Sequence, residues 1–154
     1  MKNFALLLIA ISIFTSCTTA PKNEEQKENK HAIEGTWKLI SGTLIEKNDT
    51  TVTDYTKDKS FIKVINDTHF AFMGHDLTKG KDSAFYSSGG GSYTLQGDQY
   101  TEHLDYCDDR GWEGHSFPFT VSVSNDTLIQ TGIEKIDSLG INRLNIEKYI
   151  RVKN

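Results

Sequence analysis

Hydrophobic and polar residues alternate with a period of two along most of the chain after Ile33. In the segment SFPFTVSVS at 116–124, every second residue is apolar, namely Phe117, Phe119, Val121 and Val123. This alternation is typical of a strand with one buried face, and almost no helical period is present. The pattern predicts strands at 36–46, 50–56, 60–65, 68–73, 83–87, 92–96, 99–106, 116–124, 127–133 and 143–152.

Short polar turns join three pairs of these strands. The turns are Asn66-Asp67, Gly97-Asp98 and Asn125-Asp126, and another turn is expected at 48–50. Two β-favouring runs separated by two such residues indicate a hairpin, since Asn, Asp and Gly tolerate a positive φ. About ten strands without a crossover helix predict an all-β antiparallel meander, either a sandwich or a barrel.

The glycine run in SSGGGSYTLQGDQYTEHLDY, at 87–106, does not fit a phosphate-binding loop. Ser92 and Tyr93 follow Gly91, whereas a Walker loop requires Gly-Lys-Ser/Thr before a helix. A dinucleotide loop also requires a following helix N-terminus, and here the next segment alternates with period two. We therefore expect the glycines to form a bulge or a close backbone approach at the start of a strand.

The N-terminus has the features of a secretory signal. Lys2 precedes an apolar stretch at 5–13, and the sequence FTSC follows at 14–17. This order predicts a signal peptide at 1–16, with a plain cleaved signal as the alternative to a lipoprotein signal. FTSC resembles the lipobox of bacterial lipoproteins, which implies an acylated Cys17. The implied location is the bacterial cell envelope, where the protein would be membrane-anchored on the periplasmic or surface side.

Residues 17–32 are expected to be the lipidated cysteine and a disordered tether, with a short charged helix as the alternative for the tether. The segment contains Pro21, lacks aromatic residues and interleaves Lys with Glu, so it cannot bury enough apolar surface to fold. Residues 33–154 are then one folded domain by length.

Charge and cysteine content exclude two further classes. The chain has 17 basic and 21 acidic residues, a formal net charge of −4, and its basic residues form no run, so nucleic acid is not an expected partner. The two cysteines are Cys17 and Cys107. If Cys17 is acylated, the domain has no disulfide, and Cys107 is expected to be a buried monothiol; a reactive or intermolecular thiol is the alternative.

Two motifs at opposite ends of the domain suggest a family. EGTWKLISG at 34–42 has a Gly-x-Trp at Trp37, and Arg151 lies in the last strand, within IEKYIRV. This combination resembles the calycin pattern of lipocalins and fatty-acid-binding proteins. With GGGSYTLQGDQYTEHLDY, it is similar to a lipocalin-like domain family of bacterial lipoproteins. The resemblance covers about 34–152 and implies a single barrel of eight to ten strands, closed by packing of Trp37 against Arg151.

The alternation also identifies candidate interior residues. Glu102 lies on the apolar face of its strand, where an ionised carboxylate is costly unless it is paired or hydrogen-bonded. In the last strand, Glu147 shares a face with Tyr149 and Arg151, and which face points inward is open. The expected interior residues are Trp37, Leu39, Phe70, Phe72, Tyr93, Tyr100, Glu102, Tyr106, Phe117 and Phe119.

Five of the candidates are expected to bind a ligand. They are Tyr93, Tyr100, Glu102, Phe117 and Arg151. In this interpretation, Glu102 orients the polar end of a ligand or pairs with Arg151, and the aromatic residues form the walls. The alternative is a filled core with one buried ion pair.

Other chemistry finds little support in the sequence. The five histidines lack metal-ligand spacing, with haem ligation by His69 and His103 as the alternative. The loop DYCDDRGWEGH at 105–115 lacks the order of a calcium loop and is expected at the barrel mouth, with Trp112 over the opening or exposed to a partner. No Gly-x-Ser-x-Gly motif is present. No metal, cofactor or catalytic residue is therefore predicted, and an enzyme is not the expected class.

The resulting expectation is a lipid-anchored envelope protein whose barrel binds a small hydrophobic or amphipathic molecule. The membrane would be reached through acylated Cys17. The alternative is a protein-interaction or inhibitor module of the envelope, with a closed core and an unidentified protein partner.

Overall fold

Nine antiparallel strands form the protein in the computed structural model, which describes residues 32–81 and 83–153. The predicted signal peptide, Cys17 and the tether up to residue 31 lie outside the described residues. The elements are β1 (Gly35–Glu46), β2 (Asp49–Asp54), β3 (Lys59–Ile65), β4 (His69–Asp76), β5 (Tyr86–Gln96), β6 (Gln99–Cys107), β7 (Ser116–Ser124), β8 (Thr127–Ile136), the 3-10 helix η1 (Asp137–Leu139) and β9 (Ile141–Arg151).

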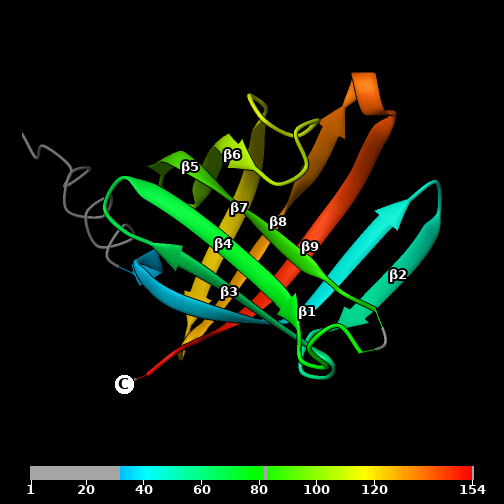
Figure 1. Ribbon diagram of the computed structural model, residues 1–154. Helices are drawn as coiled ribbons and strands as arrows, with labels where there is room; N and C mark the ends of the chain where they lie inside the picture. Colours follow the sequence, from blue (N-terminus) through cyan, green and yellow to red (C-terminus); the bar gives the residue numbers. More distant parts are fainter. Residues whose placement is uncertain (1–31, 82, 154) are drawn as a thin grey trace, which may run out of the picture.

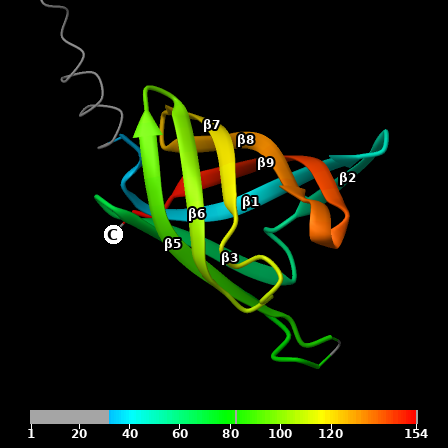
Figure 2. The same ribbon diagram turned by 90° about the horizontal axis from the view of Figure 1, so that it is seen from above.

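Eight of the strands close into a barrel. The order in the sheet is β2-β1-β3-β4-β5-β6-β7-β8-β9, and an additional β1–β9 pairing joins the two sides (Figure 1). Strand β1 pairs with β3 over residues 35–38 and with β2 over residues 41–46. Strand β2 therefore lies beside the part of β1 that β3 leaves, while β1 stays paired with β9 through Ile45, and Figure 2 shows the tip of the β1–β2 hairpin reaching beyond the other strands. The predicted all-β meander barrel is confirmed, with eight strands in the barrel and one beside it.

The glycine run lies in the middle of a strand and not at its start. Of the segments predicted as two separate strands, 83–85 lie in a loop. Residues 86–87 and 92–96 belong to one strand, β5, which continues through Gly89, Gly90 and Gly91. The predicted bulge is present, because the register with β6 shifts between Gly90 and Gly91. A Cβ atom at Gly89 would lie 2.5 Å from the Phe72 ring, so β5 can pass this ring only as glycine.

The same bulge changes which β6 side chains point inward. Gly91 pairs with Leu104 and Gly90 pairs with Tyr106, so β6 has one extra residue at Asp105. An extra residue moves all later side chains to the opposite face. Tyr106 is consequently 72% exposed, and its predicted interior position is wrong. Cys107 takes the inward position instead.

The hairpin turns use two different mechanisms. Asn125 and Asp126 have φ values of 46° and 62°, as expected for a two-residue turn. The turn after β3 is longer than predicted, since β4 begins at His69. There the Asn66 side-chain oxygen accepts hydrogen bonds from the backbone N–H groups of Thr68, at 2.9 Å, and His69, at 2.8 Å. The first hairpin turns at Lys47-Asn48, earlier than the predicted 48–50.

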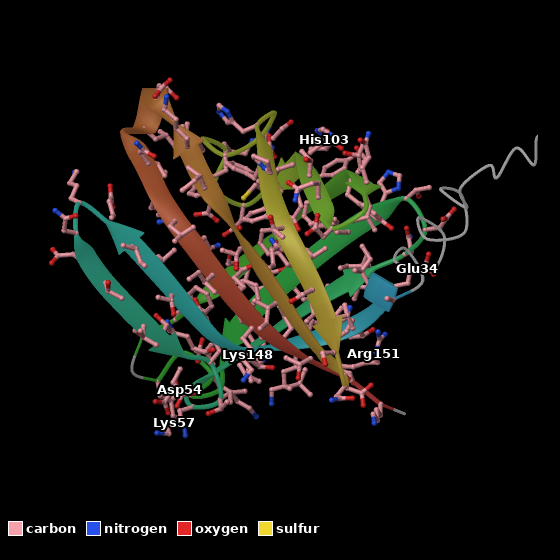
Figure 3. All side chains as sticks on the ribbon, turned by 180° about the vertical axis from the view of Figure 1, so that it is seen from behind. Glu34, Asp54, Lys57, His103, Lys148 and Arg151 are labelled. Atoms are coloured by element: carbon pink, nitrogen blue, oxygen red, sulfur yellow. The ribbon has the colours of Figure 1, made fainter. Side chains whose placement is uncertain are left out.

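The expected contact between Trp37 and Arg151 is present at one end of the barrel. The Arg151 guanidinium carbon lies 4.1 Å from the Trp37 ring centroid. Its two terminal nitrogens donate to the backbone oxygens of Ala32 and Glu34, both at 2.6 Å, and Figure 3 shows Arg151 and Glu34 at this end. The Trp37 indole N–H donates to the Ile33 carbonyl at 2.7 Å.

The apolar core is densest around this contact. Trp37 is completely buried, and Ile33, Ile65, Phe70 and Leu128 are at most 3% exposed. This end of the barrel is therefore filled with side chains and bounded by the chain segment that precedes β1.

Replacing Trp37 by Ala is expected to lower the free energy of unfolding by about 3–5 kcal/mol, because a large buried side chain and its contact with Arg151 are lost. Urea unfolding measured by circular dichroism would check this. Trp112→Ala is the matched control, and it should cost less than half as much because Trp112 is only half-buried. Equal losses for the two variants would contradict a special role of Trp37.

Candidate functional site

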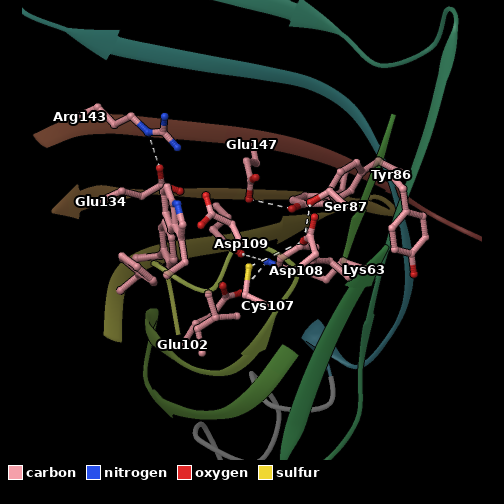
Figure 4. Close-up of a pocket in the computed structure, with 18 of the residues that line it drawn as sticks. Lys63, Tyr86, Ser87, Glu102, Cys107, Asp108, Asp109, Glu134, Arg143 and Glu147 are labelled. Atoms are coloured by element: carbon pink, nitrogen blue, oxygen red, sulfur yellow. Dashed lines mark hydrogen bonds and ion pairs between the residues drawn. The ribbon is translucent and has the colours of Figure 1, made fainter. Parts of the chain in front are cut away.

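A cavity of about 400 Å³ lies inside the barrel at the end away from Trp37. Its apolar walls come mainly from aromatic side chains, namely Phe61, Phe72, Phe85, Trp112, Phe117 and Phe119. Strands β3, β6, β8 and β9 contribute the polar side chains Lys63, Glu102, Gln130, Glu134, Arg143 and Glu147, and the loop after β6 adds Asp108 and Asp109 (Figure 4). Apolar walls with a few convergent polar groups are typical of small-molecule sites.

Glycines make room for the aromatic wall. The rings of Phe61 and Phe72 are stacked with centroids 5.8 Å apart, and Phe85 lies 6.5 Å from Phe61. A Cβ atom at Gly74 would overlap the Phe61 ring, as one at Gly89 would overlap Phe72. The rings therefore lie flat against β4 and β5, and the space in front of them stays open.

A buried lysine, Lys63, binds two of the polar side chains of the cavity. The Lys63 ammonium lies 2.5 Å from a Glu102 carboxylate oxygen and 3.0 Å from the Gln130 side-chain oxygen. Lys63 and Glu102 are only 3% and 7% exposed. Burial raises the pKa of Glu102, and the Lys63 charge opposes this increase. The prediction that Glu102 points into the barrel is confirmed, and of the two environments considered for it, the structure shows a neighbouring cation.

A second ion pair lies between β8 and β9. The Arg143 Nε lies 2.6 Å from Glu134 Oε2, and the Asn145 amide donates to Glu134 Oε1 at 2.7 Å. Burial raises the pKa of Glu134, and Arg143 opposes this. The Arg143 guanidinium also lies 5.2 Å from the Trp112 ring centroid, and Trp112 packs against Phe117 with centroids 5.5 Å apart. This pair thus positions Trp112. Trp112 lines the cavity, which agrees with its predicted place over the barrel opening and not with exposure to a partner.

Glu147 is bound differently from the other two glutamates. The Tyr149 hydroxyl donates to Glu147 Oε2 at 2.7 Å. Within residues 32–81 and 83–153, Glu147 forms no ion pair. Burial, followed by the Glu147 charge, raises the pKa of Tyr149 well above its usual value. The polar face of β9 therefore points inward, which answers the question that the sequence left open.

The loop after β6 forms the rim of the cavity. Asp108 accepts a hydrogen bond from the Ser88 backbone N–H at 2.8 Å, and Glu113 accepts one from the Cys107 N–H at 2.9 Å. Cys107 is half-buried with a free thiol, and burial raises the pKa of that thiol. Its persistence as a monothiol remains a prediction.

The structure places two of the five predicted ligand-binding residues at the cavity. Glu102 and Phe117 line it, whereas Tyr93, Tyr100 and Arg151 do not. The Tyr93 hydroxyl donates to the Asn66 carbonyl at 2.9 Å. The proposed pairing of Glu102 with Arg151 is wrong, because Arg151 is held at the Trp37 end and Lys63 is the partner.

Tyr100 lies next to Glu102 but is not among the residues that line the cavity. It is 1% exposed, and its hydroxyl meets hydrogen-bond geometry with no group in the described part of the chain. Burial, and then the neighbouring Glu102 carboxylate, raise its pKa well above the usual value. Tyr100 is therefore a buried neighbour of Glu102 that does not line the cavity.

Sequence reasoning missed Lys63, Gln130, Glu134 and Arg143. The signal for Lys63 was present, because Phe61, Lys63 and Ile65 alternate on one face of SFIKVI. Gln130 likewise follows Leu128 by two residues. Glu134 lay beyond the predicted end of its strand at residue 133, whereas β8 continues to Ile136.

None of the four histidines within residues 32–153 lines the cavity. His69 is exposed, and His103 is bound from outside by the Ser116 hydroxyl, with 2.8 Å between Nδ1 and Oγ (Figure 3). A haem inside the barrel would not reach either side chain, so the haem alternative is not supported. No group of three His, Cys, Asp or Glu that could hold a metal occurs among the described residues.

Comparison with known proteins leaves the assignment to the structure itself. No protein-family model matches this sequence, and no curated protein matches it. The described part of the chain also has no helix that is long and apolar enough to cross a membrane.

The Lys63–Glu102 pair is expected to be strongly coupled. Lys63→Met or Glu102→Leu alone should each lower the free energy of unfolding by about 3–5 kcal/mol, because each leaves a buried unpaired charge. The double variant should lose much less than the sum of the two. Urea unfolding of all four proteins would measure the coupling, and additive losses would contradict it.

The Lys63→Met variant should also respond to pH. Burial holds the pKa of Glu102 above its ordinary value of 4.5, and loss of Lys63 raises it further. The protonated carboxyl then stabilises the fold at low pH, and this contribution is lost as the pH rises through the raised pKa. The deficit of the variant relative to the wild type should therefore be smallest below pH 4.5.

Proposed function

We propose that this protein is a lipid-anchored protein of the bacterial envelope that binds a small, partly apolar molecule inside its barrel. The observation that carries the proposal is the 400 Å³ cavity with aromatic walls and buried polar side chains. Its volume falls within the range of natural ligand pockets. The proposed role is binding and not catalysis.

The buried charges support a binding role over a purely structural one. Two ion pairs, Lys63–Glu102 and Arg143–Glu134, lie in the wall of the cavity. Replacing a buried ion pair by well-packed apolar residues is often neutral or stabilising. Folding stability alone therefore gives little reason to bury two ion pairs here, whereas the orientation of a ligand in the cavity would be a reason to do so. A closed core, as in the alternative interaction module, would also leave no space of this size.

The lipocalin-like resemblance supports the proposal at the level of the general plan. Lipocalins are eight-stranded barrels that enclose one small ligand. The Trp37–Arg151 contact closes one end here, and the cavity opens toward the other. The proposed ligand would enter at the rim formed by the loop after β6.

A cavity-blocking substitution tests the binding proposal. Ser87 lines the cavity, so Ser87→Trp should fill part of it and remove a bound molecule. Native mass spectrometry of the full chain purified from its own host would show a small-molecule mass on the wild type, reduced at least about tenfold in the variant. Such a loss corresponds to about 1.4 kcal/mol.

Thr94→Trp provides the matched control, because Thr94 is exposed on the same strand, β5. This variant should keep the bound mass. The proposal fails if no small molecule accompanies the wild type, or if both tryptophan variants retain it equally.

The anchor is tested separately. Cys17→Ala should release the protein from the membrane fraction and abolish incorporation of labelled fatty acid, since acyl chains supply the membrane affinity. Cys107→Ala is the matched control and should remain membrane-bound. An unlabelled wild type, with the Cys17 variant still in the membrane, would exclude the lipoprotein assignment.

A further inference from the structure

The cavity wall contains more acidic than basic side chains. Its cations are Lys63 and Arg143, and its carboxylates are Glu102, Glu134, Glu147, Asp108 and Asp109. The excess persists if the two buried glutamates, Glu102 and Glu134, are protonated, because three carboxylates then face two cations. A ligand with a positive charge would therefore be favoured in the cavity over one with a negative charge.

Both cations are already held by carboxylates. Lys63 lies 2.5 Å from Glu102, and Arg143 lies 2.6 Å from Glu134. An anionic ligand that used either cation would have to displace a buried carboxylate, which would then lose its partner. The cost of an unpaired buried charge makes this exchange unfavourable.

Glu147 is the carboxylate in the best position to meet a ligand cation. It points from β9 into the pocket, where Figure 4 shows it between the Glu134–Arg143 pair and Lys63. Oε2 accepts the Tyr149 hydroxyl at 2.7 Å, which fixes the carboxylate without neutralising it. Among the described residues no cation pairs with it, so its charge remains available.

The aromatic wall suits the same kind of ligand. Rings in this wall already contact cations, since the Lys59 ammonium lies 4.8 Å from the Phe85 centroid and the Arg143 guanidinium 5.2 Å from that of Trp112. Phe61, Phe72 and Phe117 present further ring surface. Such faces attract ammonium groups through the ring quadrupole and also cover an apolar body.

We propose that the ligand is an organic cation, an amine with an apolar body, whose ammonium group binds Glu147 while its body packs against the phenylalanine wall. This inference rests on the proposed binding function and names the chemical class of the ligand. It distinguishes the cavity from one that would bind fatty acids or other anionic amphiphiles.

Three probes of matched shape test the charge preference in the full chain by calorimetry. They are 4-phenylbutylamine, 4-phenylbutanol and 4-phenylbutyrate. The amine should bind at least about tenfold more tightly than the alcohol, because a charge-assisted hydrogen bond is stronger than a neutral one. The carboxylate should bind most weakly.

Glu147→Gln keeps an acceptor for Tyr149 and removes the charge. This variant should lose the preference for the amine and bind the alcohol as the wild type does, whereas Glu46→Gln, a change at a partly exposed position on β1 outside the cavity, should alter neither. Equal or tighter binding of the alcohol or carboxylate overturns the inference and leaves small-molecule binding intact. Failure of all three probes to bind also overturns it. The binding function itself is tested separately, by the loss of the bound small-molecule mass in Ser87→Trp.

Discussion

The pairing of β1 with β9 is the constraint on which the rest of the structure depends. It joins the first and last strands, and the contact between Arg151 and the Glu34 carbonyl spans 117 residues of sequence. Without this pairing, the inner faces of eight strands would form an open sheet, and Lys63 and Glu102 would be in water. Arg151 stabilises the closure twice, by its contact with the Trp37 ring and by hydrogen bonds to two backbone carbonyls. Closure of so long a loop carries a large entropic cost, which the dense core around Trp37 offsets.

Closure also explains why the two ends of the barrel differ. At the Trp37 end, large apolar side chains such as Phe70 and Leu128 fill the interior. Toward the other end, glycines replace side chains at positions such as Gly74 and Gly89, and the rings of Phe61 and Phe72 occupy the space that they leave. The inward positions between them hold charged side chains: Lys63 and Glu134 pair with residues of other strands, whereas Glu147 is held by Tyr149 of its own strand. One end thus supplies the stability that allows the other to hold charges around a cavity.

Much of this fold could be predicted from the alternation of residues, and the errors have identifiable causes. The alternation placed β7 correctly and put Glu102 inside, because both depend only on local period and burial. It misplaced Tyr106, because a bulge at Asp105 reverses the alternation and no local signal marks its position on β6. It offered Arg151 as one possible partner of Glu102 and missed Lys63, because which inward side chains meet depends on strand register across the barrel. Glu134 was missed because β8 continues to Ile136, beyond the predicted end of the strand at residue 133.

The same reasoning indicates which features of the site are determined by the fold and which are not. Lys63 and Glu102 need each other once both are buried, so their pairing follows from burial alone. Glu147 has no such requirement, since its neighbour Tyr149 donates a hydrogen bond without neutralising its charge. A fixed carboxylate without a cation, facing aromatic rings inside a barrel, contributes little to folding stability in its observed form. A second hydrogen-bond donor or a positive charge would stabilise this carboxylate further, and the cavity leaves room for a ligand that carries one.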